Sequence, residues 1–465
     1  MSGLDRAENK ADKSLPYMKT LTPFILLLGM SAMADAPRNV ILFIGDGMST
    51  PQRIVADEFS RKVNGEAMAM NAFPCHATTL TYSLSSLVTD SAAAATAIAC
   101  GEKTNNGAVG VDGDGKPVAS CAEAARDSGR KVGIVTSVTI NHATPAGFYA
   151  HQDSRSMLYQ IGLDLVRSRF DLFLGGGLDN ANVKTNGVAE YVGDLYDYAA
   201  ANGYCVSCGR EGFDALSTSP APDRIWWRSS EKALPYAIDA RDEDCPRLPE
   251  LTRFALDFLD AKSNDGKGFF LMVEGGRIDW AGHANEAAAN LRDMLELDSA
   301  VKVALEYQKA HPDTLIVVTG DHETGGMSIG FAGTGYAFYM ERLASQTCST
   351  ERFRDRCRAL RDRNAPFEEA AALLSECYGF RFDGKEGDPM TLTEAEVADM
   401  KYQYLHGSLD DKARRIMQDR AGVGWTSGSH TGLPALTTSI GPGAERITGL
   451  LENTDISKIV KSFWQ

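Results

Sequence analysis

The sequence is short of positive charge. Its 465 residues include 47 Lys and Arg against 62 Asp and Glu, which gives a formal net charge of −15 at pH 7. A surface this negative argues against binding to nucleic acid and against docking on anionic lipid. A phosphate-bearing substrate would therefore need local positive charge, which bound metal ions and an arginine could supply.

The sequence also lacks an apolar run long enough to span a membrane. Residues 21–30 form an apolar stretch, but it is too short to cross a bilayer. A lysine-bearing segment starting at Met18 precedes it, and small residues ending at Ala34 follow it, as in a signal peptide. We predict cleavage after Ala34 and a periplasmic or secreted protein that begins near Asp35 and has no stable membrane anchor. Residues 1–17, whose Asp5, Glu8 and Asp12 do not fit a signal peptide, would be an upstream extension; the alternative is a disordered tail ahead of an interfacial helix.

Repeats, low-complexity tracts and paired CxxC motifs are absent. Cys205 and Cys208 form one CxxC with no second copy, which argues against a zinc finger. Nine cysteines in an exported protein nevertheless suggest some disulfides. Because nine is odd, at least one thiol is free or paired between chains, and the sequence does not give the connectivity.

Short β-branched runs alternate with helical stretches, in a chain of ordinary globular composition with 43% hydrophobic residues. The strands expected to be buried are residues 40–44, 131–138, 171–174, 269–273 and 315–319. The expected helices include residues 91–100, 119–128 and 280–308, the last within a helical pattern running from 277 to 311. This alternation predicts an α/β fold, a three-layer sandwich around a large, mostly parallel central sheet.

A long segment separates two histidines of interest. Between His322 and His430 lie 107 residues (430 − 322 − 1), many of them charged and helical in pattern. We predict one large domain over residues 35–465, after an extension and signal peptide at 1–34. An inserted cap- or crown-like subdomain is expected at about 328–425.

Oxygen-bearing side chains follow several of the expected strands. Asp46, Thr144, Glu274 and Asp321 each come just after a strand. In a parallel sheet, ligands bind beyond the carboxyl ends of the strands. We therefore expect these four side chains to meet at one edge. Asp46 alone, between two glycines, would be read as a turn residue.

A set of carboxylates and histidines points to a multi-metal site. Asp279 and His283 are four residues apart in a helical pattern, which places both on one face. Glu274, the pair Asp321-His322, and His430 complete the set. Each alone could be a satisfied polar loop residue, but together the carboxylates would repel one another without a cation.

Ser91 opens an alanine-rich helix directly after Asp90. Both residues make good N-caps, and the helix N-terminus also favours an attacking alkoxide and a phosphate. A hydroxyl nucleophile beside clustered metal ligands indicates metal-assisted hydrolysis of a phosphate ester. Arg155 would then offer a bidentate fork for phosphate, although by default it is a solvated surface charge. His142 alone would be a plain polar loop residue.

These motifs together resemble the alkaline phosphatase family. The resemblance runs from about Asn39 to the C-terminus, is weak through the expected insertion and excludes the N-terminal extension. The segments that carry it, in order, are Ile44-Gly45-Asp46-Gly47-Met48, Asp90-Ser91-Ala92-Ala93, His142-Ala143-Thr144-Pro145, Arg155, Val273-Glu274-Gly275, Asp279 with His283, Thr319-Gly320-Asp321-His322, Ser429-His430-Thr431-Gly432 and Gly441-Pro442-Gly443-Ala444.

The resemblance implies a role for each matching residue. Ser91 would be the nucleophile that forms a phosphoserine, and Arg155 would clamp the phosphate. Two Zn²⁺ and one Mg²⁺ are expected per chain. The ligand sets would be Asp279, His283 and His430 for the first zinc, Asp46, Asp321 and His322 for the second, and Asp46, Thr144 and Glu274 for the magnesium.

Two positions depart from the commonest family pattern. His142 stands where relatives carry Asp or His, and Trp280 where many carry Lys or His; a bacterial subgroup has this His/Trp pair. The pair removes a carboxylate near the third metal and a cation near the phosphate. We expect His142 and Trp280 to lie close to the phosphate, outside the metal ligands.

The resemblance implies a phosphomonoesterase that acts on small phosphate monoesters and forms a homodimer, and the signal-peptide pattern predicts that it is exported. A phosphodiesterase of the same superfamily is one alternative, disfavoured by the complete third-metal set of Thr144 and Glu274 together with Arg155. A non-catalytic exported protein that binds metal or phosphate is another, disfavoured by Ser91.

Overall fold

The computed structural model describes residues 36–464, apart from 184–189, 219–221, 242–243, 264, 332–333 and 386. The expected upstream extension, signal peptide and cleavage site lie outside the described residues. Within the described residues, no helix is both long enough and apolar enough to cross a bilayer.

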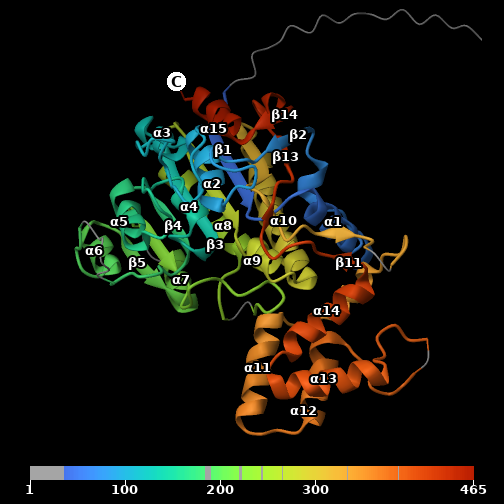
Figure 1. Ribbon diagram of the computed structural model, residues 1–465. Helices are drawn as coiled ribbons and strands as arrows, with labels where there is room; N and C mark the ends of the chain where they lie inside the picture. The colour runs from blue at the N-terminus through green and yellow to red at the C-terminus, as the bar shows by residue number, and fades with distance from the viewer. Residues whose placement is uncertain are drawn as a thin grey trace, which may run out of the picture. The chain divides into compact units, whose positions relative to one another are not determined.

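A ten-stranded sheet forms the centre of the molecule (Figure 1), in the order β14-β2-β13-β8-β1-β7-β3-β4-β6-β5. Its strands are β1 (Asn39–Gly45), β2 (Cys75–Leu80), β3 (Lys131–Thr139), β4 (Leu172–Gly176), β5 (Cys205–Cys208), β6 (Ile225–Arg228), β7 (Phe269–Gly275), β8 (Thr314–Gly320), β13 (Ala435–Ile440) and β14 (Gly449–Glu452). All five strands expected from sequence are present, as β1, β3, β4, β7 and β8.

Most neighbouring strands are parallel. β1 pairs in parallel with β7 on one side and β8 on the other, with Gly45 opposite both Gly275 and Gly320. β13 is the exception, because it pairs antiparallel with both β2 and β8. The mostly parallel sheet expected from the sequence is confirmed, and its aligned register brings the carboxyl ends of β1, β7 and β8 level.

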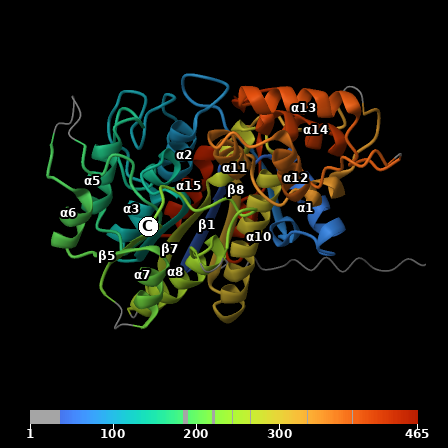
Figure 2. The same cartoon turned by 90° about the horizontal axis from the view of Figure 1, so that it is seen from below.

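Both faces of the sheet are buried along the central strands β1, β7 and β8. Along β1, Ile41 and Phe43 belong to one hydrophobic cluster, whereas Val40, Leu42 and Ile44 belong to the other. β1 therefore needs apolar residues on both faces, which explains its nearly unbroken hydrophobic run. In Figure 2, α8 and α10 lie on one side of β1 and β7, and α2 and α15 lie on the other.

The helices around the sheet alternate with the strands along the chain. They are α1 (Thr50–Val63), α2 (Ser91–Cys100), α3 (Cys121–Asp127), α4 (Ala143–Ala146), α5 (Leu158–Ser168), α6 (Leu195–Ala201), α7 (Gly209–Thr218), α8 (Leu248–Lys262), α9 (Arg277–His283), α10 (Ala287–Ala310) and α15 (Asn453–Ser462), with 3₁₀ turns at Ala69–Ala72 and Ala444–Arg446.

The expectation of one continuous helix from 277 to 311 is wrong. The chain breaks between α9 and α10, where Asn285 adopts a left-handed conformation with φ of 50°. Its side-chain amide donates to the carbonyl oxygens of Gly282 (3.0 Å) and Ser427 (2.7 Å). Asparagine tolerates this conformation because its short side chain bonds locally. Asp279 and His283 both stay on α9.

The segment expected to be an insertion starts and ends at a pair of short strands. β10 (Ser328–Ile329) pairs antiparallel with β11 (Val423–Gly424). Between them lie a 3₁₀ turn (Met340–Ser345) and the helices α11 (Thr350–Asp362), α12 (Phe367–Tyr378), α13 (Glu394–His406) and α14 (Leu409–Ala421). A second short pair, β9 (Glu323–Thr324) with β12 (His430–Thr431), lies next to the metal-ligand motifs.

All nine cysteines are free thiols in the structure, so it shows none of the disulfides that the cysteine count suggests. Cys205 and Cys208 begin and end the edge strand β5. The cysteines are also missing from the clusters of potential metal ligands among the described residues.

Candidate active site

The expected metal ligands meet at the carboxyl ends of the central strands. Asp46 follows β1, Glu274 lies near the end of β7, and Asp321 follows β8. Thr144 lies in α4, after β3, and its hydroxyl donates to Asp46 Oδ2 at 3.1 Å. The four side chains that sequence analysis places at one edge of the sheet are therefore neighbours.

Three groups of side chains could each hold a metal ion. Within each group the ligand atoms lie within 4.8 Å of one another. The groups are Asp279, His283 and His430; Asp46, Asp321 and His322; and Asp46, His142 and Glu274. Asp46 is shared by two groups, which places two candidate sites side by side.

The polar atoms of these groups fit cations. Asp46 Oδ1, Glu274 Oε1, Asp321 Oδ2 and His142 Nδ1 are buried and have no hydrogen-bond partner among the described residues. An unpaired buried carboxylate oxygen costs free energy unless a cation or a donor satisfies it. Carboxylate and imidazole donors are ligands that zinc accepts, and oxygen donors suit magnesium. The donor set is therefore suited to holding divalent metal ions.

Backbone carbonyls set the direction of two imidazole rings. His283 Nδ1 lies 2.8 Å from the carbonyl oxygen of Gly428, and His430 Nδ1 lies 2.9 Å from that of Thr89. These contacts leave both Nε2 atoms facing inward, 3.2 Å from each other and 3.4–3.5 Å from Asp279 Oδ1. Such outer partners fix the tautomer of metal-binding histidines.

Burial and mutual repulsion perturb the carboxylates. Burial, strengthened by the charge of Asp321, raises the pKa of Asp46 well above its ordinary value. Burial also raises the pKa of Glu274 from 4.5 to about 8 and that of Asp321 from 3.8 to about 7. Asp279 differs: burial alone would raise its pKa, but the hydrogen bond from His430 and the nearby imidazoles lower it. Without a cation, this cluster favours protonated carboxylates.

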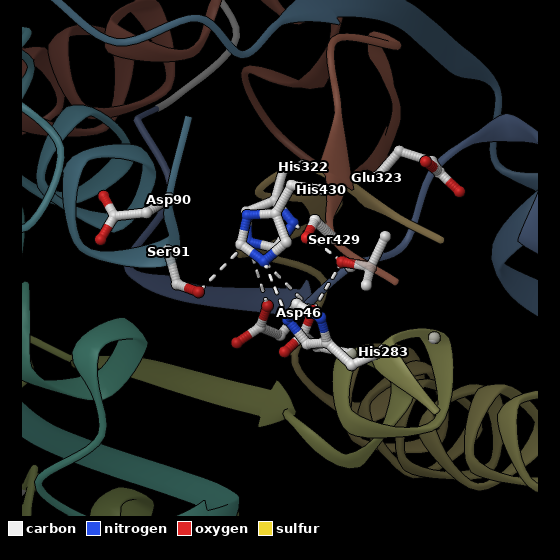
Figure 3. A network of polar contacts seen from close by, with 12 residues as sticks. Asp46, Asp90, Ser91, His283, His322, Glu323, Ser429 and His430 are labelled. Atoms are coloured by element: carbon white, nitrogen blue, oxygen red, sulfur yellow. Dashed lines mark hydrogen bonds and ion pairs between the residues drawn. The ribbon is translucent and has the colours of Figure 1, made fainter. Parts of the chain in front are cut away.

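Ser91 begins α2 and faces the histidines (Figure 3). Its side chain is buried, and its Oγ lies 3.2 Å from His322 Nε2. Asp90 is the N-cap of α2, and its Oδ1 accepts a hydrogen bond from the amide of Ala93 at 3.0 Å. Asp90 therefore caps the helix, as one interpretation of the pair expects, and Ser91 stands at the positive end of the helix dipole.

Arg155 lies in the same site, held from two sides. Its guanidinium donates to Asp90 Oδ2 at 3.2 Å and lies 3.2 Å from His142 Nε2. His142 in turn lies edge-on to the ring of Trp280, with ring centroids 6.3 Å apart. Burial, followed by the charge of Arg155, lowers the pKa of His142 from 6.5 to about 4. His142 is thus a neutral side chain, and its Nδ1 is 3.9 Å from Asp46 Oδ2.

Sequence analysis missed several residues that complete the site. The hydroxyl of Thr136 donates to Glu274, and that of Thr324 donates to Asp279. Glu323, directly after the Asp321-His322 pair, is a fully buried carboxylate. The one sequence signal that could have pointed to Glu323 is its position in the run from Asp321 to Thr324. Its full burial is visible only in the structure, and charged side chains are seldom fully buried unless they are paired.

Comparison with known proteins identifies the family. The family model for alkaline phosphatase matches residues 37–465. Alkaline phosphatase 3 of Bacillus subtilis is 32% identical over 442 residues, covering 92% of this chain and 88% of the relative. The repressible alkaline phosphatase of Saccharomyces cerevisiae is 30% identical, covering 92% of this chain and 81% of its own.

Solved structures agree with the sequence matches. The cold-active alkaline phosphatase of Shewanella superimposes with a TM-score of 0.80 at 29% identity, covering 92% of this chain and all of its own. The Thermus thermophilus enzyme gives 0.77 at 29% identity, over 92% and 91% of the two chains. Structures of the alkaline phosphatase of the Antarctic bacterium TAB5 give 0.65–0.67 at 26–27% identity, over 93% of this chain and 98–99% of theirs. Together with the metal-ligand clusters around Ser91, these matches show that the chain belongs to the alkaline phosphatase family and is a metal-dependent phosphomonoesterase.

Proposed function

We propose that the enzyme hydrolyses small phosphate monoesters through a covalent phosphoserine on Ser91. The observation that carries this proposal is the placement of Ser91 Oγ, buried at a helix N-terminus and 3.2 Å from a candidate metal ligand, His322 Nε2. In the first step the Oγ–phosphorus bond forms and the bond from phosphorus to the alcohol oxygen breaks; Ser91 loses its hydroxyl proton, and the alcohol leaves carrying one proton. The oxygen of a water molecule then bonds to phosphorus, the bond to Ser91 Oγ breaks, one proton of the water restores the Ser91 hydroxyl, and inorganic phosphate is released.

Two Zn²⁺ and one Mg²⁺ would occupy three neighbouring sites built from these clusters and Thr144. Asp279, His283 and His430 would hold one zinc, and Asp46, Asp321 and His322 the other. Asp46, Thr144 and Glu274 would hold magnesium. When bound, these cations would neutralise the carboxylates and stabilise negative charge on the entering and leaving oxygens of an in-line displacement.

Arg155 would bind two phosphate oxygens through its planar fork. Its hydrogen bond to Asp90 aims the guanidinium toward the N-terminus of α2, where Ser91 lies. This contact also fixes the side chain before substrate arrives, which lowers the entropy lost on binding. Recognition would thus centre on the phosphoryl group, so the alcohol matters little for turnover.

The third site is where this chain differs most from the commonest pattern. A variant of the Antarctic TAB5 enzyme in which a histidine is replaced by aspartate has Mg bound in its M3 site. We propose that His142 corresponds to that histidine, because its Nδ1 lies 3.9 Å from Asp46 Oδ2. Magnesium remains our assignment, because Asp46, Thr144 and Glu274 all offer oxygen.

We further propose that the enzyme is exported to the periplasm or beyond and acts as a homodimer.

Phosphodiesterase activity is the rival function, and non-catalytic binding of metal or phosphate is the more distant alternative. Three measurements on one preparation discriminate: metal content, turnover of a phosphate monoester against a diester across pH, and transfer of labelled phosphate to Ser91. We expect three bound metals, turnover of the monoester well above that of the diester, and label on Ser91. Faster turnover of the diester, or no label with either substrate, would contradict the proposal.

A further inference from the structure

Glu323 is a fully buried carboxylate that none of the three metal clusters includes. It follows Asp321 and His322, yet its side chain points away from the imidazole rings (Figure 3). Both oxygens accept hydrogen bonds. Oε1 accepts from Gln52 Nε2 at 2.6 Å and from the amide of Met327 at 3.1 Å. Oε2 accepts from the amide of Gly326 at 2.9 Å and from the hydroxyl of Thr431. Its acceptor capacity is used on the protein itself.

Two of these bonds hold a tight turn over residues 323–327. Gly325 and Gly326 have φ of 93° and 59°, a conformation that glycine adopts without strain. A Cβ on Gly325 would lie 2.4 Å from Cε3 of Trp425, so the turn also needs the small residue for space. The amide of Gly325 donates to the carbonyl oxygen of Ser429 at 2.9 Å. The turn therefore anchors the chain just before His430.

The hydrogen bond between the Thr431 hydroxyl and Glu323 Oε2 reaches β12, the strand that carries His430. β9 and β12 pair with Thr431 opposite Glu323 and His430 opposite Thr324. The Thr431 hydroxyl, bonded to Glu323, thus fixes the residue next to His430. The loop ahead of His430 also contains Gly428, whose carbonyl oxygen lies 2.8 Å from His283 Nδ1. One carboxylate is therefore connected, through one turn, to the orientation of two imidazoles.

We propose that Glu323 is a positioning residue for the cluster of Asp279, His283 and His430. By holding the 323–327 turn and Thr431, it sets the direction of His430 directly and of His283 through Gly428. The inference rests on the proposed function, in which this cluster holds a zinc. Its effect should be selective, because the Asp46, Asp321 and His322 cluster is built mainly from the ends of β1 and β8.

Gln52 supplies the basis for a reciprocal test. Its Oε1 accepts the amide of Ser49 at 3.2 Å, so its NH₂ must face Glu323 Oε1 and the carbonyl oxygen of Thr324. Replacing Glu323 with Gln keeps the shape but turns one acceptor into a donor. Unpaired buried donors are costly, so the turn should shift. Adding Gln52→Glu restores an acceptor opposite the new donor.

The experiment measures zinc transfer from the full-length, metal-loaded protein to a chromogenic chelator. For Glu323→Gln we expect one zinc per chain to bind about 10–100-fold more weakly, the range typical of outer-shell partners, while the other zinc is unchanged. The double variant Gln52→Glu with Glu323→Gln should recover part of that loss. Asp298→Asn is the matched control, because Asp298 also accepts two backbone amides, those of Ala69 (3.1 Å) and Met70 (2.9 Å). It should lower the melting temperature without selective zinc loss.

The positioning role would be overturned if Glu323→Gln weakened the binding of both zincs equally or of neither. It would also be overturned if Asp298→Asn showed the same loss of zinc affinity. If Glu323→Gln does not fold, Thr431→Val provides the test, because it removes one donor and leaves the turn in place. It should weaken the same zinc several-fold, and an unchanged zinc would overturn the inference. Wild-type protein that binds no zinc at all would instead refute the proposed function.

Discussion

At the scale of single residues, Ser91 has the central role in the proposed mechanism, as the nucleophile that forms the phosphoserine. It is buried, begins α2 and faces His322. Replacing Ser91 with Ala should lower kcat at least about 100-fold, because the group that forms the covalent intermediate is lost. Metal content and melting temperature should stay near those of the wild type, since the Ser91 side chain is small and belongs to none of the three clusters. Steady-state kinetics of the metal-loaded Ser91→Ala variant measure this. Turnover close to that of the wild type would refute the assignment.

His142 lies beside the proposed third metal site. Its Nδ1 is unpaired among the described residues and lies 3.9 Å from Asp46 Oδ2. His142→Asp should strengthen magnesium binding, because a carboxylate adds negative charge beside Asp46 and an oxygen donor. Magnesium titration of zinc-loaded protein, followed by calorimetry, measures the change. His142→Asn is the control, because it offers an oxygen without the charge and should have a smaller effect. Equal affinity in wild type and His142→Asp would contradict this prediction.

The buried carboxylates make the metal-free protein sensitive to pH. In the folded state the pKa of Glu274 is raised from 4.5 to about 8 and that of Asp321 from 3.8 to about 7. The folded protein therefore holds protons that the unfolded chain has released, so stability falls as pH rises toward 8. Buried His142, whose pKa is lowered from 6.5 to about 4, has the opposite slope, but only below about pH 6.5.

Between pH 6.5 and 8, therefore, the titration of His142 no longer opposes the effect of Glu274 and Asp321 on stability. We expect the melting temperature of chelator-treated protein to fall across this window, while that of metal-loaded protein does not, because cations favour the ionised carboxylates. Glu274→Gln should flatten the slope of the metal-free protein. Thermal unfolding at several pH values checks this, and a metal-free melting temperature that rises with pH would show that the sign is wrong.

At the scale of elements, the segment between β10 and β11 is joined to the catalytic part by specific contacts. Buried Glu286, just after α9, accepts hydrogen bonds from the amide of Thr350 at 2.7 Å and from Gln346 Nε2 at 2.8 Å. Arg277, on α9, lies 3.5 Å from the Glu351 carboxylate and 4.7 Å from the Trp280 ring centroid. A segment this long needs a surface that buries its apolar residues. Its function as a cap or dimer interface stays a prediction.

Removal of α11–α13 tests that prediction. Deleting residues 350–406 and joining the ends with a flexible linker keeps α14 and the 340–345 turn, both of which contribute to the main hydrophobic cluster. We expect weaker self-association or an altered preference among monoesters of different size, with zinc content unchanged. Analytical ultracentrifugation and kinetics on a small and a bulky ester measure both. If assembly, stability and kinetics all stay the same, the segment has neither function.

At the scale of the whole molecule, the proposed export would determine where the mature protein begins. The predicted signal peptide starts at Met18 and ends at Ala34, outside the described residues. Protein exported by a bacterial host should therefore begin near Asp35. Intact-mass spectrometry of the exported protein measures this directly. Residues 1–34 still attached to the exported enzyme would refute the signal-peptide interpretation, and a Lys19→Glu variant with reduced export would support it.

Much of the architecture could be predicted from the chain. The strands β1, β7 and β8 are unbroken apolar runs, because each is covered on both faces, and such runs are visible without a structure. The strands β2, β13 and β14 were not predicted, since β2 and β13 contain polar Thr or Ser residues and β14 is only four residues long with an exposed start. The break at Asn285 was also missed, because the amide contacts that hold it include Ser427, far away in the sequence.

The sequence by itself determined which residue types are available and where they follow strands: Asp46, Glu274 and Asp321 at strand ends, with Asp279 and His283 on one helical face. Local periodicity and turn chemistry suffice for that, because they act over a few residues. Only the tertiary structure decided that His430 Nε2 stands 3.2 Å from His283 Nε2, and that buried Glu323 bonds Thr431 and Gln52. Those contacts join segments more than 100 residues apart, so they depend on the register of the sheet and the packing of the loops at its edge, which no local pattern encodes.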